Sequence, residues 1–124
     1  MSKTRKPVLG GRDKVKVAIA QISPVFLNRD ASLERAVSAI GEAAKNGAEL
    51  VVFPEVWLAG YPYWTEGWDS NIPGWIGGRI AFRDAASVVP SEDTDRIGAA
   101  ARQHNIHVVM GCNEIDSRPE SDTI

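Results

Sequence analysis

Residues 14–22 (KVKVAIAQI) form an apolar run that contains Val15, Val17, Ile19 and the apolar positions that follow. This short run predicts a buried β-strand. Residues 29–48 change to apolar spacings of three and four, which predict a helix with one buried face. The apolar positions of that helix are Leu33, Ala36, Val37, Ile40, Ala43 and Ala44.

The ends of this helix and the element after it also follow from the pattern. Asn28 or Asp30 is suited to cap the helix start, and Asn46-Gly47 to end it in a left-handed turn. Residues 48–54 (AELVVFP) are apolar on both faces, which is typical of a central strand in a parallel sheet. Strand, helix and strand with short joints form a βαβ unit.

Two further helices and a third strand are expected in the second half of the chain. A short helix is expected over residues 80–86 and a longer one after Pro90-Ser91, over residues 92–105, with acids at its start as the helix dipole favours. Its inner stripe is expected to contain Ile97, Ala100, Ala101 and His104. A third strand follows at residues 106–115. The order β-α-β-loop-α-β predicts an α/β layered sheet.

Residues 56–80 interrupt the pattern. All four tryptophans lie here, among glycines and prolines: Trp57, Trp64, Trp68 and Trp75. A long loop of this kind inside a compact domain is uncommon and often functional. Two interpretations stay open: the rings pack over the sheet edge, or they line a small-molecule pocket.

Composition narrows the class of protein. The 124 residues are 44% hydrophobic and 24% charged with a net charge of -2, which favours a soluble globular domain over a general nucleic-acid binder. Basic residues crowd positions 1–13, which we expect to form a solvated tail before a domain at 14–124. No apolar run reaches bilayer length, and the start lacks the apolar core of a secretory signal. We therefore expect no membrane and no nucleic-acid partner.

The residues able to carry chemistry are few. Glu55 follows the central strand, at the edge where open α/β sheets bind ligands, and apolar neighbours there would desolvate it and suit it to act as a general base. A structural acid is the alternative. The single cysteine, Cys112, excludes an internal disulfide, suits a reducing compartment such as the cytoplasm, and is expected to be an inert core thiol. Glu114, His104 and His107 are expected to be structural.

The stretch GAELVVFPEVWLAGYP, at residues 47–62, resembles the first signature of the nitrilase, or carbon–nitrogen hydrolase, superfamily. Phe53, Glu55, Leu58 and the Gly60-Tyr61-Pro62 turn match at the family's spacing. Residues 17–28 and 99–114 are similar to the same family. Within it, the GYP turn followed by aromatics most resembles the nitrilase branch, and the similarity extends over nearly the whole chain from Lys14.

The resemblance implies an αββα sandwich and a Glu–Lys–Cys triad that hydrolyses a nitrile or amide without metal or other cofactor. Glu55 matches the general base of that triad. Trp57, Tyr61 and Trp64, which follow it, are expected to shape the substrate pocket. Neither the lysines of this chain nor Cys112 match the other two catalytic positions.

These departures predict a partial sandwich, the amino-terminal part of a carbon–nitrogen hydrolase domain. The complete protein is expected to turn a nitrile into a carboxylic acid and ammonia, and to form a homo-oligomer, whereas the 124-residue chain alone is expected to be inactive. An amidase or carbamoylase of the same superfamily is one alternative. A non-catalytic α/β module that self-associates is the other.

Overall fold

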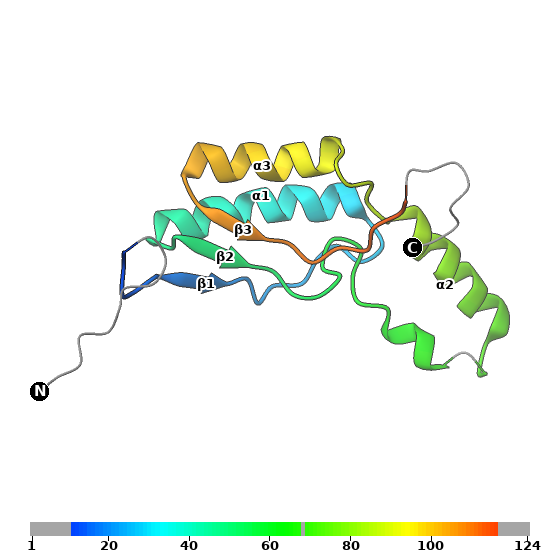
Figure 1. The fold of residues 1–124 in the computed structure, drawn as a ribbon. Coiled ribbons are helices and arrows are strands. Elements are labelled where there is room, and N and C mark those ends of the chain that lie inside the picture. The colour runs from blue at the N-terminus through cyan, green and yellow to red at the C-terminus, as the bar shows by residue number, and fades with distance from the viewer. Residues whose placement is uncertain (1–10, 68, 117–124) are drawn as a thin grey trace, which may run out of the picture.

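The fold is an α/β layered sheet, as the sequence predicts. The structure is a computed structural model that describes residues 11–67 and 69–116. Three parallel strands form one sheet in the order β1-β2-β3: β1 (Val17–Ile19), β2 (Leu50–Val52) and β3 (His107–Val109). The helices are α1 (Arg29–Lys45), α2 (Ile72–Asp84) and α3 (Glu92–His104), with a short 3-10 helix η1 (Tyr63–Gly67). Figure 1 shows α2 and η1 beyond one end of the sheet.

The first helix is built as its sequence predicts. The Asn28 side chain accepts a hydrogen bond from the Ala31 N–H at 3.1 Å, which satisfies one of the free donors at the helix start. Its buried stripe contains Leu33 and Ile40, both fully buried. Gly47 has a φ of 85° just beyond the helix, a conformation that glycine adopts without strain.

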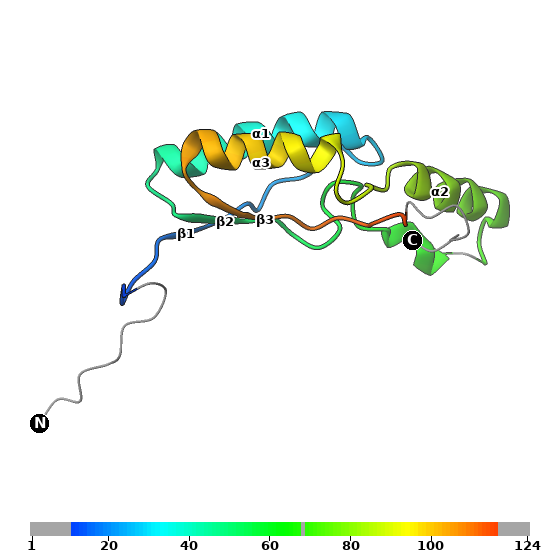
Figure 2. The same ribbon diagram turned by 45° about the horizontal axis from the view of Figure 1, so that its top comes forward.

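The helix α3 lies beside α1 on the same face of the sheet (Figures 1 and 2). Ser91 and Thr94 cap the start of α3: the Ser91 N–H donates a hydrogen bond to the Thr94 hydroxyl at 2.9 Å. The two helices approach closely because Gly41 has no side chain. A Cβ placed on Gly41 would lie 3.2 Å from the His104 ring, which assigns His104 a packing role.

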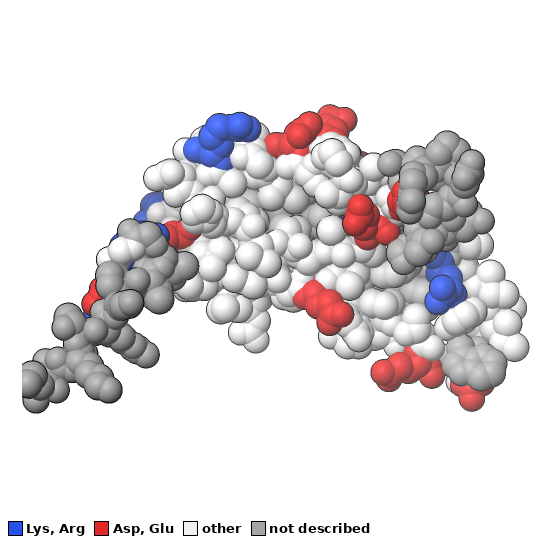
Figure 3. All heavy atoms as spheres, in the orientation of Figure 1, with Lys and Arg blue, Asp and Glu red and all other residues white. Residues whose placement is uncertain are grey.

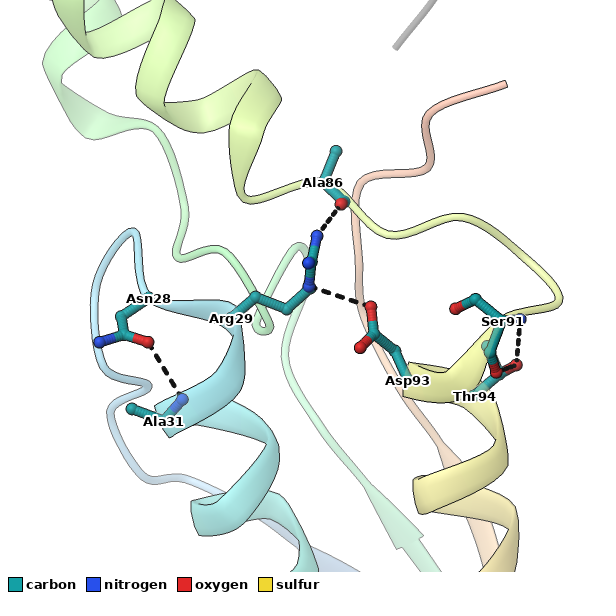
Figure 4. A network of polar contacts seen from close by, with 7 residues as sticks. All are labelled: Asn28, Arg29, Ala31, Ala86, Ser91, Asp93 and Thr94. Carbon is teal, nitrogen blue, oxygen red and sulfur yellow. Dashed lines mark hydrogen bonds and ion pairs between the residues drawn. The ribbon is translucent and has the colours of Figure 1, made fainter. Parts of the chain in front are cut away.

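A polar network joins the starts of these two helices (Figure 4). The Arg29 guanidinium pairs with the Asp93 carboxylate at 3.0 Å and donates to the Ala86 carbonyl. Both charged side chains are largely shielded, with 31% and 16% of their surfaces exposed. The network therefore fixes the segment before α3 against the start of α1.

The opposite face of the sheet is open among the described residues. Ala18, Val51 and Val108 lie toward the helices, whereas Ile19 is 71% and Val109 51% exposed. The strand predicted from Val15, Val17 and Ile19 is present, but its predicted burial is wrong for this chain: Val17 is 45% exposed like Ile19 on the open face, and Val15 is half-buried. Figure 3 shows few charged side chains over the middle of the molecule in its view.

Residues 56–80 are more helical than the sequence predicts. The helix α2 begins at Ile72, not near Ile80, because the Asn71 side chain accepts from the Gly74 N–H at 3.0 Å and Pro73 is tolerated in a first turn. Its glycines obscured the helical pattern. None of the helices in the described part of the chain has the length and apolar character needed to span a membrane.

The tail predicted for residues 1–13 lies mostly outside the described residues. Arg12 pairs with Glu49, and the Lys16 ammonium donates to the Asn46 carbonyl at 2.6 Å. These contacts connect the segment before β1 to the α1–β2 joint. The boundary at residue 14 stays a prediction.

Candidate functional site

Glu55 lies at the carboxyl end of the central strand, as predicted. The chain turns immediately after it: Val56 has a φ of 50°, and the Gly60 N–H donates to the Val56 carbonyl at 2.9 Å. The Leu58 N–H donates to the Gly111 carbonyl at 3.1 Å, which connects this turn to the segment after β3. The position of Glu55 is therefore determined by backbone contacts on both sides of it.

A groove of about 410 Å³ opens at this edge of the sheet. Two segments line it, the β1–α1 loop and the turn after β2. Its lining residues are Ile22, Ser23, Pro24, Phe26, Pro54, Glu55, Trp57, Tyr61 and Tyr63. The groove thus combines a carboxylate with an apolar and aromatic wall, as small-molecule sites commonly do.

Glu55 itself is exposed to solvent. The sequence predicts a desolvated carboxylate, and that prediction is wrong for the described chain. The physical reason is that the described residues around the groove leave the Glu55 side chain open to solvent. Glu55 is therefore accessible to a ligand or to another protein segment.

Trp57 is the residue that holds the two loops together. It is 2% exposed, and its indole N–H donates to the Ile22 carbonyl at 2.7 Å. Its ring packs against Phe53, with centroids 4.9 Å apart. Trp57 therefore lines the groove, although nearly all of its side chain is buried in the core, and its expected role in a substrate pocket stays a prediction.

The same two loops meet at a second point. The Leu27 N–H donates to the Ala59 carbonyl at 2.8 Å. Gly60, with a φ of 94°, lies under the Phe26 ring, where a Cβ would come within 2.3 Å of a ring carbon. Glycine is required here for its conformation and for the space that Phe26 occupies.

Sequence reasoning missed two aromatic residues of the groove. Tyr63 is 76% exposed and stacks at an angle against Tyr61, with centroids 4.7 Å apart. Phe26, 48% exposed, enters from the β1–α1 loop. Tyr63 could have been found as the next aromatic after the predicted Tyr61, whereas Phe26 lies 29 positions before Glu55 and carries no comparable signal.

Trp64 does not line this groove, although it was predicted to shape the pocket with Trp57 and Tyr61. Its ring lies edge-on to Phe82 of α2 at a centroid distance of 6.2 Å and covers Gly78. Trp75 donates its indole N–H to the Thr65 carbonyl at 3.3 Å. Trp64 and Trp75 therefore pack between η1 and α2 rather than over the sheet edge, and a small-molecule pocket lined by the tryptophans stays a prediction. Trp68 lies outside the described residues.

Cys112 follows β3 and packs half-buried against the core. Burial, reinforced by the nearby Glu114 carboxylate, raises the pKa of the Cys112 thiol. A raised pKa lowers the thiolate fraction at neutral pH and therefore the nucleophilicity. This environment is that of a structural thiol, in agreement with the sequence prediction.

The remaining candidates also have structural positions. Glu114 is exposed and pairs through its backbone with Ser87 in a parallel bridge. His107 lies in β3 and is exposed. Within residues 11–67 and 69–116, no three His, Cys, Asp or Glu side chains gather in a way that could hold a metal ion.

The chain is similar in sequence to known proteins. A family model described as carbon-nitrogen hydrolase matches residues 16–124. An aliphatic nitrilase of Rhodococcus rhodochrous is 44% identical over 111 residues, which are 89% of this chain and 28% of that protein. A cyanide hydratase of Leptosphaeria maculans is 37% identical over 103 residues, 83% of the chain and 28% of that protein.

An arylacetonitrilase of Aspergillus niger is 41% identical over 103 residues, 83% of the chain and 29% of that protein. The chain therefore spans less than a third of the length of these relatives. The names of these three relatives refer to nitriles or to cyanide.

Proposed function

Because the chain belongs to the carbon–nitrogen hydrolase family, we propose that the complete protein is a nitrilase that uses Glu55 as its general base. The reaction adds two waters to a nitrile and yields a carboxylic acid and ammonia. The observation that carries the proposal is the position of Glu55, at the carboxyl end of β2 and in the wall of an aromatic groove. Similarity to nitrilases over most of the chain supports it.

In the proposed mechanism, Glu55 takes the proton of a cysteine thiol, and the thiolate attacks the nitrile carbon. This addition gives a thioimidate, and a first water adds to it to form a tetrahedral intermediate, whose developing charge a lysine ammonium stabilises. Ammonia leaves and a thioester remains. A second water releases the acid and the free thiol, and Glu55 serves the proton transfers of both halves. We propose that the cysteine and the lysine come from outside these 124 residues.

The surroundings of Cys112 support this division of roles. Its thiol is half-buried against the core and has a raised pKa, which is the opposite of an activated nucleophile. The 124-residue chain alone is therefore proposed to be inactive. Ammonia release by the purified chain, abolished by Cys112→Ser, would contradict this.

The residues that line the groove indicate the class of substrate. Trp57, Tyr61, Tyr63 and Phe26 offer aromatic surface next to Glu55, which suits the apolar part of an organic nitrile. Several relatives are named cyanide hydratases, so hydration of cyanide to formamide is a second candidate. An amidase or carbamoylase is the remaining alternative.

The test uses the complete protein. Nitriles, amides, carbamoyl compounds and cyanide are supplied in turn, and ammonia, acid and amide are measured. We expect Glu55→Gln to lower kcat by at least about 100-fold, the usual contribution of general base catalysis. Glu34→Gln, a change at an exposed acid of α1, is the matched control and should keep normal turnover. Normal turnover in Glu55→Gln would refute the role of Glu55.

A further inference from the structure

Phe26 lines the groove from a loop that hydrogen bonds hold on both sides of this residue. The buried Ser32 hydroxyl accepts from the Val25 N–H and donates to the Val25 carbonyl, both at 3.0 Å. On the other side, the Leu27 N–H donates to the Ala59 carbonyl at 2.8 Å. The backbone before Phe26 is therefore fixed to α1, and the backbone after it is fixed to the turn that follows β2.

The position of the Phe26 ring is defined by Gly60. A Cβ placed on Gly60 would come within 2.3 Å of Cδ2 and 2.7 Å of Cε2 of this ring, so the ring lies directly against the glycine. Phe26 is nevertheless 48% exposed. One part of the ring is thus packed on the Gly60 backbone, while another part lines the groove.

The other aromatic residues of the groove offer a different kind of surface. Trp57 is almost fully buried, so little of its ring is available to a ligand. Tyr61 and Tyr63 pack against each other, and each carries a hydroxyl that needs water or another hydrogen-bond partner. Among the described residues that line the groove, Phe26 alone has an aromatic ring without a polar group.

We propose that Phe26 determines the substrate class: its ring binds the carbon substituent of the nitrile, so that the groove takes nitriles with an apolar chain or ring rather than cyanide. This inference rests on the proposed function, in which Glu55 serves the reaction at the nitrile carbon. Glu55 and Phe26 line one groove of about 410 Å³, which has the size of a small-molecule site. A ligand that reacts beside Glu55 can therefore extend its substituent to the ring.

The selection follows from the hydrophobic effect. Cyanide has no substituent, so the Phe26 ring contributes nothing to its binding. An apolar chain that covers the ring removes the surface of both from water, and one methylene in an apolar site changes kcat/KM by on the order of 10-fold or more. Because Gly60 and the two flanking hydrogen bonds already hold the ring, little ordering of the side chain opposes this gain.

The experiment compares two nitriles on the complete protein. Hexanenitrile and acetonitrile carry the same reacting group and differ in the length of the apolar chain, and hexanamide and acetamide give the same comparison for an amidase. The measured quantity is the ratio of kcat/KM for the long substrate to kcat/KM for the short one. We expect Phe26→Ala to lower this ratio about 10-fold, mainly through a higher KM for the long substrate.

Two further variants separate contact with the substrate from damage to the loop. Phe26→Leu keeps an apolar side chain and should retain most of the wild-type ratio. Val25→Ala changes the same loop at a side chain that is not part of the groove lining, and it should leave the ratio unchanged. Circular dichroism should show the same helix content in the three variants.

An unchanged or higher ratio in Phe26→Ala would overturn the inference, as would an equal fall in Val25→Ala. A wild-type protein that prefers cyanide to hexanenitrile would also overturn it. These results leave the role of Glu55 intact, because turnover persists in each case.

A wild-type protein that hydrolyses neither nitriles nor amides would instead refute the proposed function. Equilibrium dialysis of hexanenitrile against the Glu55→Gln protein then decides the role of Phe26 without any turnover. Adding Phe26→Ala is expected to weaken the binding about 10-fold. No binding, or the same affinity with and without the Phe26 ring, would contradict the inference.

Discussion

Gly111 and Pro54 are in direct backbone contact between the ends of two neighbouring strands. A Cβ placed on Gly111 would lie 1.9 Å from the Pro54 carbonyl oxygen and 2.8 Å from the Val56 nitrogen. Only glycine allows this approach. The contact encloses the backbone of Glu55 between its two neighbours, so the segment after β3 helps to place the candidate base.

We therefore expect Gly111→Ala to be strongly destabilising, by about 3 kcal/mol or more, because backbone rather than a flexible side chain must move. Gly98→Ala is the control: a Cβ at this exposed site in α3 meets nothing within 4 Å and should stabilise the helix by roughly 0.5–1 kcal/mol. Urea unfolding followed by circular dichroism measures both. Equal effects of the two changes would contradict the contact.

Trp57 is expected to stabilise the site by connecting its two loops. Trp57→Phe keeps most of the packing but leaves the Ile22 carbonyl without its donor, and should cost about 1–2 kcal/mol. Trp57→Ala also removes the buried ring and should cost about 3–5 kcal/mol. Thermal unfolding distinguishes the two, and a smaller loss for the alanine variant would show that the ring is not core.

The ion pair between Arg29 and Asp93 is shielded enough to contribute to stability. Asp93→Ala should lower the free energy of unfolding by about 1–2 kcal/mol more than Asp95→Ala does. Both acids lie in the first turn of α3 and both favour its dipole, but Asp95 is exposed and carries no corresponding ion pair in the described contacts. Chemical unfolding of both variants measures the difference, and a loss that is the same at both positions would assign the effect to the dipole alone.

The raised pKa of Cys112 has a consequence that depends on pH. Because the folded chain holds the thiol proton more tightly than the unfolded chain does, the stability that this group contributes is present below the ordinary thiol pKa. It is lost as the pH rises through the folded pKa. Alkylation by iodoacetamide should accordingly be slow at pH 7 and accelerate only above the pH at which a free cysteine reacts. Rapid alkylation of the folded chain at pH 7 would contradict a raised pKa.

Much of the fold follows from local pattern. The stripe of Leu33 and Ile40 identified α1, Asn28 and Gly47 marked its ends, and the two-sided apolar run of β2 identified the central strand. Glu55 was found because it directly follows that run. These features depend on periodicity and on capping chemistry, which act between residues close in sequence.

Tertiary structure decided the rest, because the deciding contacts join distant residues. The exposure of Ile19 depends on what covers its face of the sheet, and the role of Trp64 depends on Phe82 lying across from it. Phe26 enters the groove only because Gly60, 34 positions later, leaves room for its ring. The sequence gives the chemical type of each residue, whereas contacts between residues distant in sequence determine which of them are buried and which lie side by side.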